Sequence, residues 1–402
     1  RCLDLVAFVN GLPVVVLTIE ESELPHIHAR IEQEMRPELP ALLWYNAFLV
    51  VANAFTCRMG SFTTPWEHYF QWKRVESEDE SESTTLETLL RGTCEPTHLL
   101  DIIENFTLFD HKGGLKKLVA RNHQYLGVNK AVAAVDRREA MPEEQRESKL
   151  GVFWHTQGSG KSYSMIFFVL KILRKISHSY KFLIVTDRQD LDQQIYENFN
   201  DVDAIIEHVQ EVHARDGEHL KQMLREPHFV LFTLIQKFSV EKPGMDYEQL
   251  SESTKIIVIS DEAHRTQDKT LAKNMRSALP RAAFIGFTGT PLIEGEDQQT
   301  RETFGGYVSV YHFRRAIRDG VTVPLRFENH TPELKFIDER QFDVNMQQLL
   351  DDPRIDPQQK QNIIDLATHP ERLLANSERL DWVASDIVEH FMGRGYQGKA
   401  MI

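Results

Sequence analysis

Residues 154–162 read Trp154-His-Thr-Gln-Gly-Ser-Gly-Lys-Ser162, and they follow a short apolar run that is typical of a buried strand. Gly158 and Gly160 allow the backbone to curl so that its N–H groups point inward, toward phosphate oxygens. A helix is expected from Ser162 onward, and its positive N-terminal end adds to the same point. This strand–loop–helix pattern predicts a phosphate-binding loop, although the full pattern has Gly where His155 stands.

The loop supplies five expected nucleotide-binding residues, which are Gly158, Ser159, Gly160, Lys161 and Ser162. Lys161 would reach the β- and γ-phosphates of a nucleoside triphosphate, because its side chain follows directly on the glycine turn. The Ser162 hydroxyl would coordinate the Mg²⁺ that accompanies the phosphates. The sequence therefore predicts both a nucleotide and a magnesium ion at this loop.

A second stretch, Ile256-Ile-Val-Ile-Ser-Asp261-Glu-Ala-His264, is an apolar strand that ends in two acids. Phosphoryl transfer to water needs one carboxylate that holds Mg²⁺ and another that orients or deprotonates the attacking water. Asp261 suits the metal role and Glu262 suits the water role. We expect His264 to link this site to the rest of the chain, although a packed core histidine is the alternative.

The third stretch is Phe284-Ile-Gly-Phe-Thr-Gly-Thr290-Pro291, another strand that ends in a polar turn. The two threonines on either side of its glycine are expected to hydrogen-bond the segment 261–264 and to move with it. Taken together, the three stretches have the order and spacing of a superfamily-two helicase motor. Alone, the third stretch would be an ordinary turn and the adjacent acids of the second a common surface feature. The Gly-Ser-Gly-Lys-Ser sequence between a strand and a long apolar helix is a much more specific signal.

Short apolar runs rich in β-branched and aromatic residues recur between residues 150 and 287, with helical stretches between them. Alternation of this kind predicts right-handed crossovers and a buried parallel sheet. The expected strands are Leu150–Trp154, Phe182–Thr186, Phe229–Thr233, Ile256–Ile259 and Ala282–Phe287, and the expected helices are Ser162–Ile176 and Leu191–Asn198. The fold class is therefore α/β.

The composition excludes some classes of protein. The 402 residues carry 60 acidic and 46 basic side chains, and the net charge of −14 weakens a nucleic-acid partner without excluding a local basic stripe. Cys2, Cys57 and Cys94 form no CxxC pair, so a reducing, cytoplasmic location is expected. No apolar run reaches the length needed to span a bilayer, which predicts no membrane partner.

The first 75 residues predict a compact α/β unit of a different kind. Strands are expected at Leu3–Val9 and Pro13–Ile19, because Asn10-Gly11 between them is a strong hairpin signal. Every residue from Glu76 to Glu82 is Glu, Asp or Ser, a run that repels itself and is expected to be a solvated linker or loop. The chain opens inside the first expected strand, which favours a sequence clipped at its N-terminus.

With these motifs in view, the chain resembles the restriction (motor) subunit of type I restriction-modification enzymes. The resemblance rests on 154–162, Asp187-Arg-Gln-Asp-Leu-Asp192, Asp261-Glu-Ala-His-Arg-Thr266, Phe287-Thr-Gly-Thr-Pro291 and, near the N-terminus, on Asn10-Gly-Leu-Pro13 and Pro65-Trp-Glu. His155 is normal for that family. Arg121-Asn-His-Gln-Tyr resembles the segment that precedes the motor core, where Gln124 would read the adenine edge. The resemblance covers essentially the whole chain.

The resemblance implies a fold, an activity and partners. It implies a PD-(D/E)xK nuclease-like domain over residues 1–75, an acidic linker and helical connector over 76–112, a RecA-like helicase lobe over 113–325, and a connector with the start of a second lobe over 326–402. It implies hydrolysis of ATP with Mg²⁺, translocation along double-stranded DNA and cleavage of that DNA. Methylase (modification) and specificity subunits would be the protein partners.

The nuclease site departs from the pattern of that family. Asp4 matches the first acid and would be a Mg²⁺ ligand, but the expected acid and lysine positions hold Thr18 and Glu20. With a three-residue hairpin loop, position 4 would face position 18. Glu20 could serve as the second acid only if the strand carried a bulge or slip. These departures predict impaired or lost cleavage, and a purely structural Asp4 stays open as the alternative.

Two alternatives to a type I restriction subunit remain open. One is a non-catalytic DNA-binding scaffold that kept a nucleotide pocket as a switch, and the other is a different superfamily-two DNA helicase or translocase. The final Lys399-Ala-Met-Ile402 is expected to begin the first strand of the second lobe.

Seven cations are candidates for contacts with the DNA backbone. They are Lys112, Lys116, Lys117, Arg121, Arg314, Arg315 and Arg318.

Overall fold

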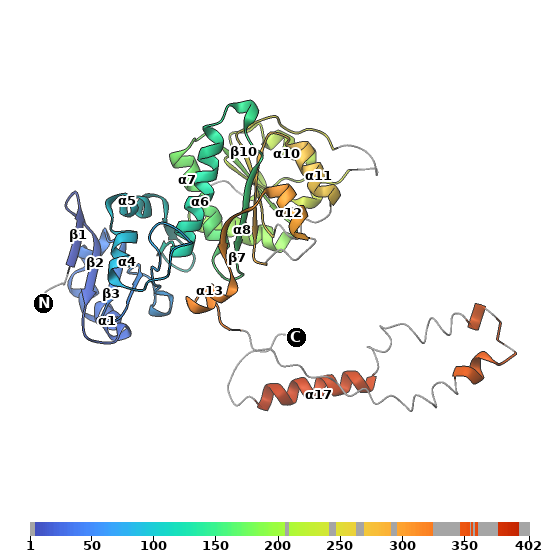
Figure 1. The fold of residues 1–402 in the computed structure, drawn as a ribbon, viewed down its shortest axis with the longest axis horizontal. Helices are drawn as coiled ribbons and strands as arrows, with labels where there is room; N and C mark the ends of the chain where they lie inside the picture. The colour runs from blue at the N-terminus through green and yellow to red at the C-terminus, as the bar shows by residue number, and fades with distance from the viewer. Residues whose placement is uncertain are drawn as a thin grey trace. The chain divides into compact units, whose positions relative to one another are not determined.

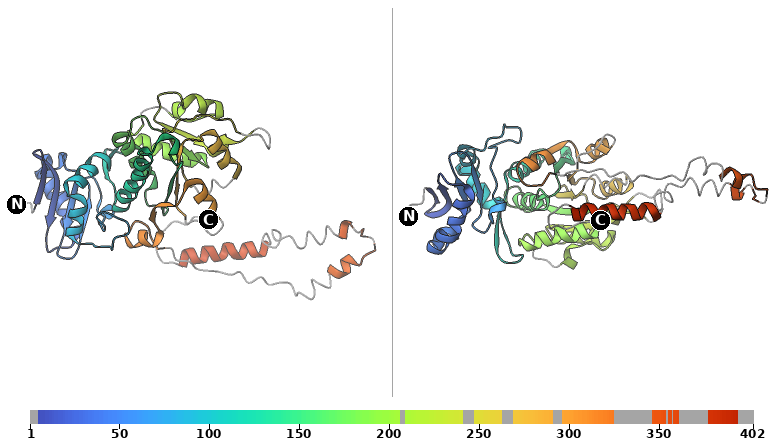
Figure 2. Two further views of the ribbon diagram at one scale, coloured as in Figure 1. Left: turned by 45° about the horizontal axis from the view of Figure 1, so that its top comes forward. Right: turned by 90° about the horizontal axis from the view of Figure 1, so that it is seen from below.

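The computed structural model of the chain divides into two compact units, Arg1–Pro324 and Leu325–Ile402 (Figures 1 and 2). The residues that it describes are 5–205, 209–240, 247–262, 269–290, 296–324, 346–353, 355–356, 358–360 and 377–393. The larger unit holds a small sheet at its N-terminal end and a larger parallel sheet beyond it. The predicted alternation of strands and helices is found in the second of these sheets.

The N-terminal sheet has four strands in the order β1-β2-β3-β4. Their bounds are β1 Leu5–Val9, β2 Leu12–Ile19, β3 Phe48–Ala52 and β4 Cys57–Gly60. The central pair, β2 and β3, is parallel, and the outer strands are antiparallel to their neighbours. Between β2 and β3 the chain forms α1 (Leu24–Arg30), a π-helical turn η1 (Ile31–Met35), α2 (Arg36–Glu38) and α3 (Pro40–Trp44). Apolar side chains of this helical stretch pack on one face of the sheet.

The N-terminal hairpin differs in one detail from the expected one. Asn10 and Gly11 alone form the turn, and both have left-handed backbone angles, with φ of 49° and 81°. The expected three-residue loop is therefore wrong. The additional residue is instead a β-bulge in β2, opposite residues 7 and 8. Beyond the bulge the register returns to the expected one, with Leu5 opposite Leu17.

The acidic segment, residues 76–82, is a loop as predicted, with Glu76, Asp79 and Ser81 exposed, but it is less solvated than its composition suggests. The backbone N–H groups of residues 75, 76 and 77 donate to the Glu80 carboxylate over distances of 2.9–3.0 Å. Arg74 pairs with Glu82 at 2.8 Å, and Glu78 is buried. Its negative charges therefore have partners that the composition of the segment alone does not reveal.

The stretch between the two sheets contains short elements and one long helix. They are η2 Trp66–His68, α4 Leu86–Thr93, α5 Pro96–Asn105, β5 Thr107–Asp110, β6 Lys116–Val119 and α6 Asn122–Glu139. β5 and β6 form an antiparallel pair of their own. α6 then leads through η3 (Glu143–Gln145) into the parallel sheet.

Six described strands form the parallel sheet, in the order β12-β7-β11-β10-β8-β9. Their bounds are β7 Lys149–His155, β8 Lys181–Thr186, β9 Val230–Leu234, β10 Ile256–Ser260, β11 Ala283–Thr288 and β12 Tyr307–Tyr311. The five expected strands are confirmed within one or two residues. The sixth strand, β12, was not predicted, and it lies beside β7 at the edge of the sheet.

Helices cover both faces of this sheet, as a parallel sheet requires. One face packs on α6, α7 (Lys161–Lys175) and α8 (Gln189–Asp201), and the other packs on α10 (Gly217–Met223), α11 (Lys269–Ala278) and α12 (Glu296–Phe304). Within β8, Phe182 and Ile184 face the first group of helices while Leu183 and Val185 face the second. The remaining short elements of this unit are α9 Val209–Val212, η4 Ile235–Phe238 and α13 Phe313–Arg318.

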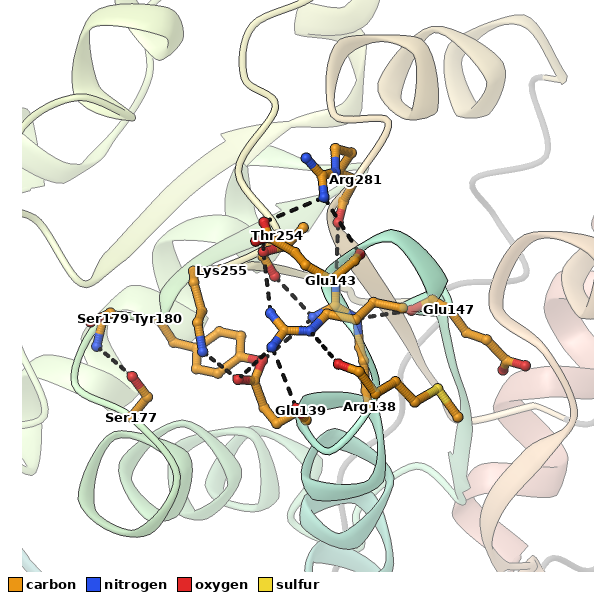
Figure 3. A network of polar contacts seen from close by, with 12 residues as sticks. Arg138, Glu139, Glu143, Glu147, Ser177, Ser179, Tyr180, Thr254, Lys255 and Arg281 are labelled. Carbon is orange, nitrogen blue, oxygen red and sulfur yellow. Dashed lines mark hydrogen bonds and ion pairs between the residues drawn. The ribbon is translucent and has the colours of Figure 1, made fainter.

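At the amino ends of the central strands, Arg138 joins three chain segments (Figure 3). Its guanidinium donates to the carbonyl oxygens of Glu147, Thr254 and Arg281 at 2.8–3.0 Å. These residues lie just before β7, β10 and β11 respectively. Arg138 is only 3% exposed, so its charge and the three carbonyl groups compensate one another away from water.

The smaller unit is described in part. α17 spans Ser377–Gly393. The strand expected at Lys399–Ile402 lies outside the described residues. Across the part of the chain that the structure describes, no helix is long and apolar enough to span a membrane.

Candidate nucleotide-binding site

The order of the strands brings the three predicted motifs together. β7 leads into the loop 156–160, β10 ends before Asp261, and β11 lies between these two strands. Because all three strands are parallel, their carboxyl ends meet at one edge of the sheet. The phosphate loop, the acid pair and Gly289 therefore lie next to one another, although about a hundred residues separate the loop from the acid pair and a further 27 separate Glu262 from Gly289.

The two glycines that predicted the phosphate loop have the backbone angles that the loop needs. Gly158 and Gly160 have φ of 80° and 83°, a region that residues with a Cβ rarely adopt. Gly160 is also the N-cap of α7, so Lys161 and Ser162 are the first two residues of that helix. A Cβ at position 160 would approach Gln124 Nε2 to 2.8 Å. The loop thus has both the curl and the helix N-terminus of an anion site.

Lys161 and Glu262 face each other across the site. The Lys161 Nζ atom lies 4.0 Å from Glu262 Oε1, and the Gly289 amide donates to Glu262 Oε2 at 3.4 Å. A Cβ at position 289 would lie 2.9 Å from Lys161 Nζ and 3.3 Å from the Gln157 backbone nitrogen, so a larger residue there would displace the end of the lysine side chain. The third motif thus hydrogen-bonds the acid pair through the Gly289 amide, whereas the threonines were the residues expected to make this contact.

The acid pair carries electrostatic and conformational strain. Burial, followed by the neighbouring charge of Glu262, raises the pKa of Asp261 to about 6. Glu262 has φ of 49°, a left-handed conformation that is unusual for a residue with a side chain. Such perturbed groups in a buried polar site are typical of functional positions.

The oxygen donors at this edge suit a magnesium ion. Mg²⁺ in nucleotide sites is held by one or two protein oxygens together with phosphate oxygens and water. Ser162 at the start of α7 and the buried Asp261 supply such a pair, and Asp261 is a carboxylate whose ionised form lacks solvation. A cation beside it would reverse that penalty, since opposite charge favours ionisation.

Gln124 contacts the phosphate loop directly. Its Oε1 accepts from the backbone N–H of Arg121 at 2.9 Å, which caps the first turn of α6, and its Nε2 donates to the Gly160 carbonyl at 3.0 Å. Both ends of the amide are thereby engaged. Contact with an adenine edge stays a prediction, and it would require this amide to exchange at least one of these partners.

Two histidines, His123 and His155, lie beside the phosphate loop, and neither of them was predicted from the sequence to support it. The His123 ring stacks on Tyr311 with 3.9 Å between centroids, and its Nε2 donates to the Ser159 carbonyl at 3.0 Å. Burial lowers the pKa of His123 to about 4 and holds that of His155 well below its usual value. Both rings are therefore neutral at physiological pH. The sequence signal for His123 was its place one residue before Gln124.

A cavity of about 1040 Å³ opens on the loop from the side of the N-terminal sheet. Gly158, Gly160 and Gln124 line one wall, and Trp66 and Lys117 belong to the residues opposite. This volume exceeds what a single nucleotide needs. It places aromatic and basic side chains of the N-terminal region within the space that adjoins the phosphate loop.

The predicted nuclease residues are not brought into a comparable site. Asp4 lies outside the described residues. Thr18 is 1% exposed, and its hydroxyl has no hydrogen-bond partner among the residues that the structure describes. Glu20 forms an ion pair with Arg30, and the bulge in β2 lies far from it in the strand. In the described part of the chain, no group of three or more His, Cys, Asp or Glu side chains is placed to hold a metal ion.

The candidate DNA-contacting cations have different surroundings. Lys112 pairs with Asp201 at 3.4 Å, and Lys117 is buried, which lowers its pKa. Arg315 donates to backbone carbonyls at 3.4 Å, whereas Arg318 stays largely exposed beside its acidic neighbour. DNA contact by these residues stays a prediction. His264 and Pro291, from the second and third motifs, lie outside the described residues.

Comparison with known proteins identifies relatives over nearly the whole chain. The sequence pattern of the SWI2/SNF2 ATPase family matches residues 123–360. A putative type I restriction enzyme endonuclease subunit of Methanocaldococcus jannaschii is 31% identical over 424 residues, which cover 99% of this chain and 40% of that protein. The HindI endonuclease subunit of Haemophilus influenzae is 36% identical over 432 residues, which cover 100% of this chain and 39% of that protein.

These relatives confirm the resemblance to type I restriction endonuclease subunits. The chain spans about two fifths of the length of the two relatives that it matches. Among solved structures, the fragment of a putative HsdR subunit from Vibrio vulnificus has 17% identity and a TM-score of 0.32, and the match covers 76% of this chain and 48% of that one.

Proposed function

The chain belongs to the SWI2/SNF2 ATPase family, and from this premise we propose that it is the ATP-hydrolysing part of a DNA translocase in a type I restriction enzyme. The observation that carries the proposal is the meeting of Lys161, Glu262 and Gly289 within 4.0 Å at the ends of neighbouring strands. Hydrolysis of a phosphoanhydride needs a cation for the phosphates and a carboxylate for the water at one place. These residues bring both together.

Each residue has a role that follows from its position. The N–H groups of Gly158 to Gly160 and the start of α7 bind the β- and γ-phosphates, and Lys161 neutralises their charge. Ser162 and Asp261 would hold Mg²⁺, which supplies further charge stabilisation when it is bound. Glu262 orients the attacking water and accepts its proton, since its side chain lies beside Lys161.

The Gly289 amide gives this site a connection to the rest of the chain. It donates to the Glu262 carboxylate at 3.4 Å, so a movement of the end of β11 changes the position of the group that handles water. A non-catalytic switch would have no use for Glu262 in a strained conformation, which favours turnover over simple nucleotide binding. Duplex DNA would be the translocated partner, with methylase and specificity subunits completing the enzyme.

The N-terminal sheet would be the nuclease-like part, and we propose that its cleavage activity is impaired. Thr18 cannot supply a carboxylate, and Glu20 is engaged by Arg30. Joint replacement Thr18→Glu and Glu20→Lys should raise plasmid cleavage if the site is degenerate. No gain from this pair, with robust cleavage by the parent, would contradict the proposal.

One assay tests the whole proposal. The purified subunit with its partner subunits is incubated with plasmid, ATP and Mg²⁺, and both ATP consumption and DNA cleavage are followed. ATP consumption that depends on DNA, with weak or absent cleavage, is the expected result. Glu262→Gln should retain ATP binding and lose turnover, and unchanged hydrolysis in that variant would remove Glu262 from its role.

A further inference from the structure

The acidic segment 76–82 makes one contact that reaches the phosphate loop. Within it, Glu78 is 7% exposed, whereas the side chain of the adjacent Asp79 is 89% exposed. Buried carboxylates are costly unless they are paired, so the burial of Glu78 needs a partner. Its partners come from two distant parts of the chain.

Glu78 is joined to His155 through Ser309. The Ser309 hydroxyl donates to Glu78 Oε1, and its oxygen lies 2.7 Å from His155 Nε2. Because the single hydroxyl hydrogen goes to the carboxylate, the hydrogen between Ser309 and His155 must come from Nε2. These two hydrogen bonds fix the His155 tautomer, in which Nε2 carries the hydrogen and Nδ1 is unprotonated. That Nδ1 has no hydrogen-bond partner in the described part of the chain.

Two cations hold Glu78 in this place. Lys130 on α6 lies 3.0 Å from Glu78 Oε2, and the Arg315 guanidinium donates to the Glu78 carbonyl at 3.4 Å. The Oε2 atom is thus paired with an ammonium group, and the Oε1 atom is left for Ser309. Both oxygens of a buried carboxylate are thereby satisfied, as a stable buried charge requires.

His155 is the last residue of β7, and the phosphate loop begins directly after it. Its ring is fully buried, lies on Phe153 with 3.9 Å between centroids, and is 5.5 Å from the His123 ring, which itself holds the Ser159 carbonyl. The start of the loop is bonded to β12 as well, because the N–H of Thr156 donates to the Tyr311 carbonyl at 2.9 Å. The orientation of the His155 ring therefore bears on where the loop leaves the sheet.

We propose that Glu78 is a positioning residue of the ATP site, which acts through Ser309 to hold His155 and with it the phosphate loop. This inference rests on the proposed ATPase function. It gives the acidic segment, which directly follows the N-terminal sheet region, a defined influence on how tightly the motor binds ATP. Neither Glu78 nor Ser309 touches the nucleotide in this scheme.

The test compares single and double variants in the purified subunit with its partner subunits and DNA. Ser309→Ala removes the link and keeps both of the groups that it joins, and Glu78→Met removes the acceptor at similar length. Each should raise KM for ATP about 5- to 10-fold, the loss of one buried hydrogen bond, with kcat at saturating ATP within about twofold. Glu76→Gln, at an exposed acid of the same segment that pairs with His98 and not with Lys130, is the matched control and should keep the parent KM.

The double variant Glu78→Met/Ser309→Ala decides whether the two residues act as one unit. A KM no higher than that of the worse single variant is expected, because either change already breaks the relay, that is, the pair of hydrogen bonds that joins Glu78 to His155 through Ser309. A KM increase equal to the product of the two single effects would overturn the relay. So would an unchanged KM in Ser309→Ala, which is the variant least able to disturb folding.

Failure of this inference is distinguishable from failure of the proposed function. A parent protein without DNA-stimulated ATP hydrolysis contradicts the proposed function itself. A parent that hydrolyses ATP normally, together with a Ser309→Ala variant of parental KM, contradicts only the role of Glu78. Thermal unfolding of each variant without nucleotide completes the set, since a change in KM at an unchanged unfolding midpoint assigns the effect to the site.

Discussion

The two edges of the parallel sheet are built from the same strands, but they carry polar groups of different kinds. At the amino ends of β7, β10 and β11, the Arg138 guanidinium donates to three carbonyl oxygens (Figure 3). At the carboxyl ends of the same strands, Asp261 has a raised pKa and His155 Nδ1 has no hydrogen-bond partner among the described residues. The first edge compensates its charge internally, and the second leaves capacity for a ligand.

This difference separates two uses of a buried charge. A compensated charge such as Arg138 fixes the relative position of chain segments, and its removal should affect stability and not chemistry. A group such as Asp261, whose charge Lys161 and a backbone hydrogen bond compensate only in part, costs stability until a further cation arrives, and its removal should affect chemistry above all. Four substitutions, two at each edge, test this separation.

The largest effect is expected at the carboxyl edge. Lys161→Ala should reduce DNA-stimulated ATP hydrolysis by more than about 100-fold, because it removes the cation that neutralises the transferring phosphoryl group. The free energy of unfolding without nucleotide should stay close to that of the parent. Steady-state ATP hydrolysis measures the effect, and Lys175→Ala at the other end of α7 is the control. An unchanged rate in Lys161→Ala would remove the motor interpretation.

Arg138→Met should show the opposite pattern at the amino edge. Three carbonyl groups would lose their shared donor, so the free energy of unfolding should fall by about 3–5 kcal/mol. At a temperature where the variant stays folded, kcat for ATP should change by less than about twofold. Denaturant unfolding measures the loss. Arg137→Met, at the exposed neighbouring position, should be nearly neutral, and equal losses in both variants would contradict the role of Arg138.

Asp261→Asn should abolish ATP hydrolysis and stabilise the protein that lacks nucleotide and metal. The pKa of Asp261 rises from 3.8 to about 6 on folding, so the folded protein binds a proton between these values that the unfolded chain has released. Stability therefore falls as pH rises from about 4 to 6, and at pH 7 the neutral amide should gain about 1–3 kcal/mol.

Unfolding free energies of parent and Asp261→Asn across this pH range measure the effect. The parent should lose stability with rising pH, and the variant should lack that slope. Addition of Mg²⁺ with a nucleotide should reduce the difference, because it favours the ionised parent. Parallel curves for the two proteins would show that Asp261 carries no buried charge.

The smallest effect is expected from Lys255, which lies near the Arg138 network. Its ammonium pairs with Glu139 and lies 4.9 Å from the centre of the Tyr180 ring, at a partly exposed position (Figure 3). Lys255→Met should cost less than about 1 kcal/mol, since exposed ion pairs contribute little. A loss as large as that of Arg138→Met, measured by the same denaturant unfolding, would show that the whole network acts as one unit.

Much of the parallel sheet and of the candidate nucleotide site was predictable because its signals are local. The five expected strands are apolar runs bounded by turns, and Gly158 and Gly160 have the left-handed angles that their pattern requires. β12 was missed because Tyr307–Tyr311 is a five-residue run with the polar Ser309 at its centre, and it lies at the edge of the sheet. No longer run of apolar residues extends it and marks it as a buried strand.

The relay from Glu78 could not be predicted, since its partners are distant in sequence. Composition alone makes residues 76–82 self-repelling, and only the fold brings Lys130 and Ser309 to Glu78. The hairpin teaches the same point on a smaller scale. The expected register was correct for residues 5–7. A two-residue turn and a bulge produce this register in place of the expected three-residue loop.

The position of β7 in the sheet has a consequence for synthesis of the chain. β7 is made before the other five strands, yet its two neighbours, β11 and β12, are the last two. His155 and Ser309 are 154 residues apart, a distance that a ribosome covers in roughly 8 to 30 s. During that time both edges of β7 lack their final neighbours and are open to pairing with other chains. The loop 156–160 is thus the first of the three motifs to leave the ribosome, and its support is completed only when the last strand of the described sheet is made.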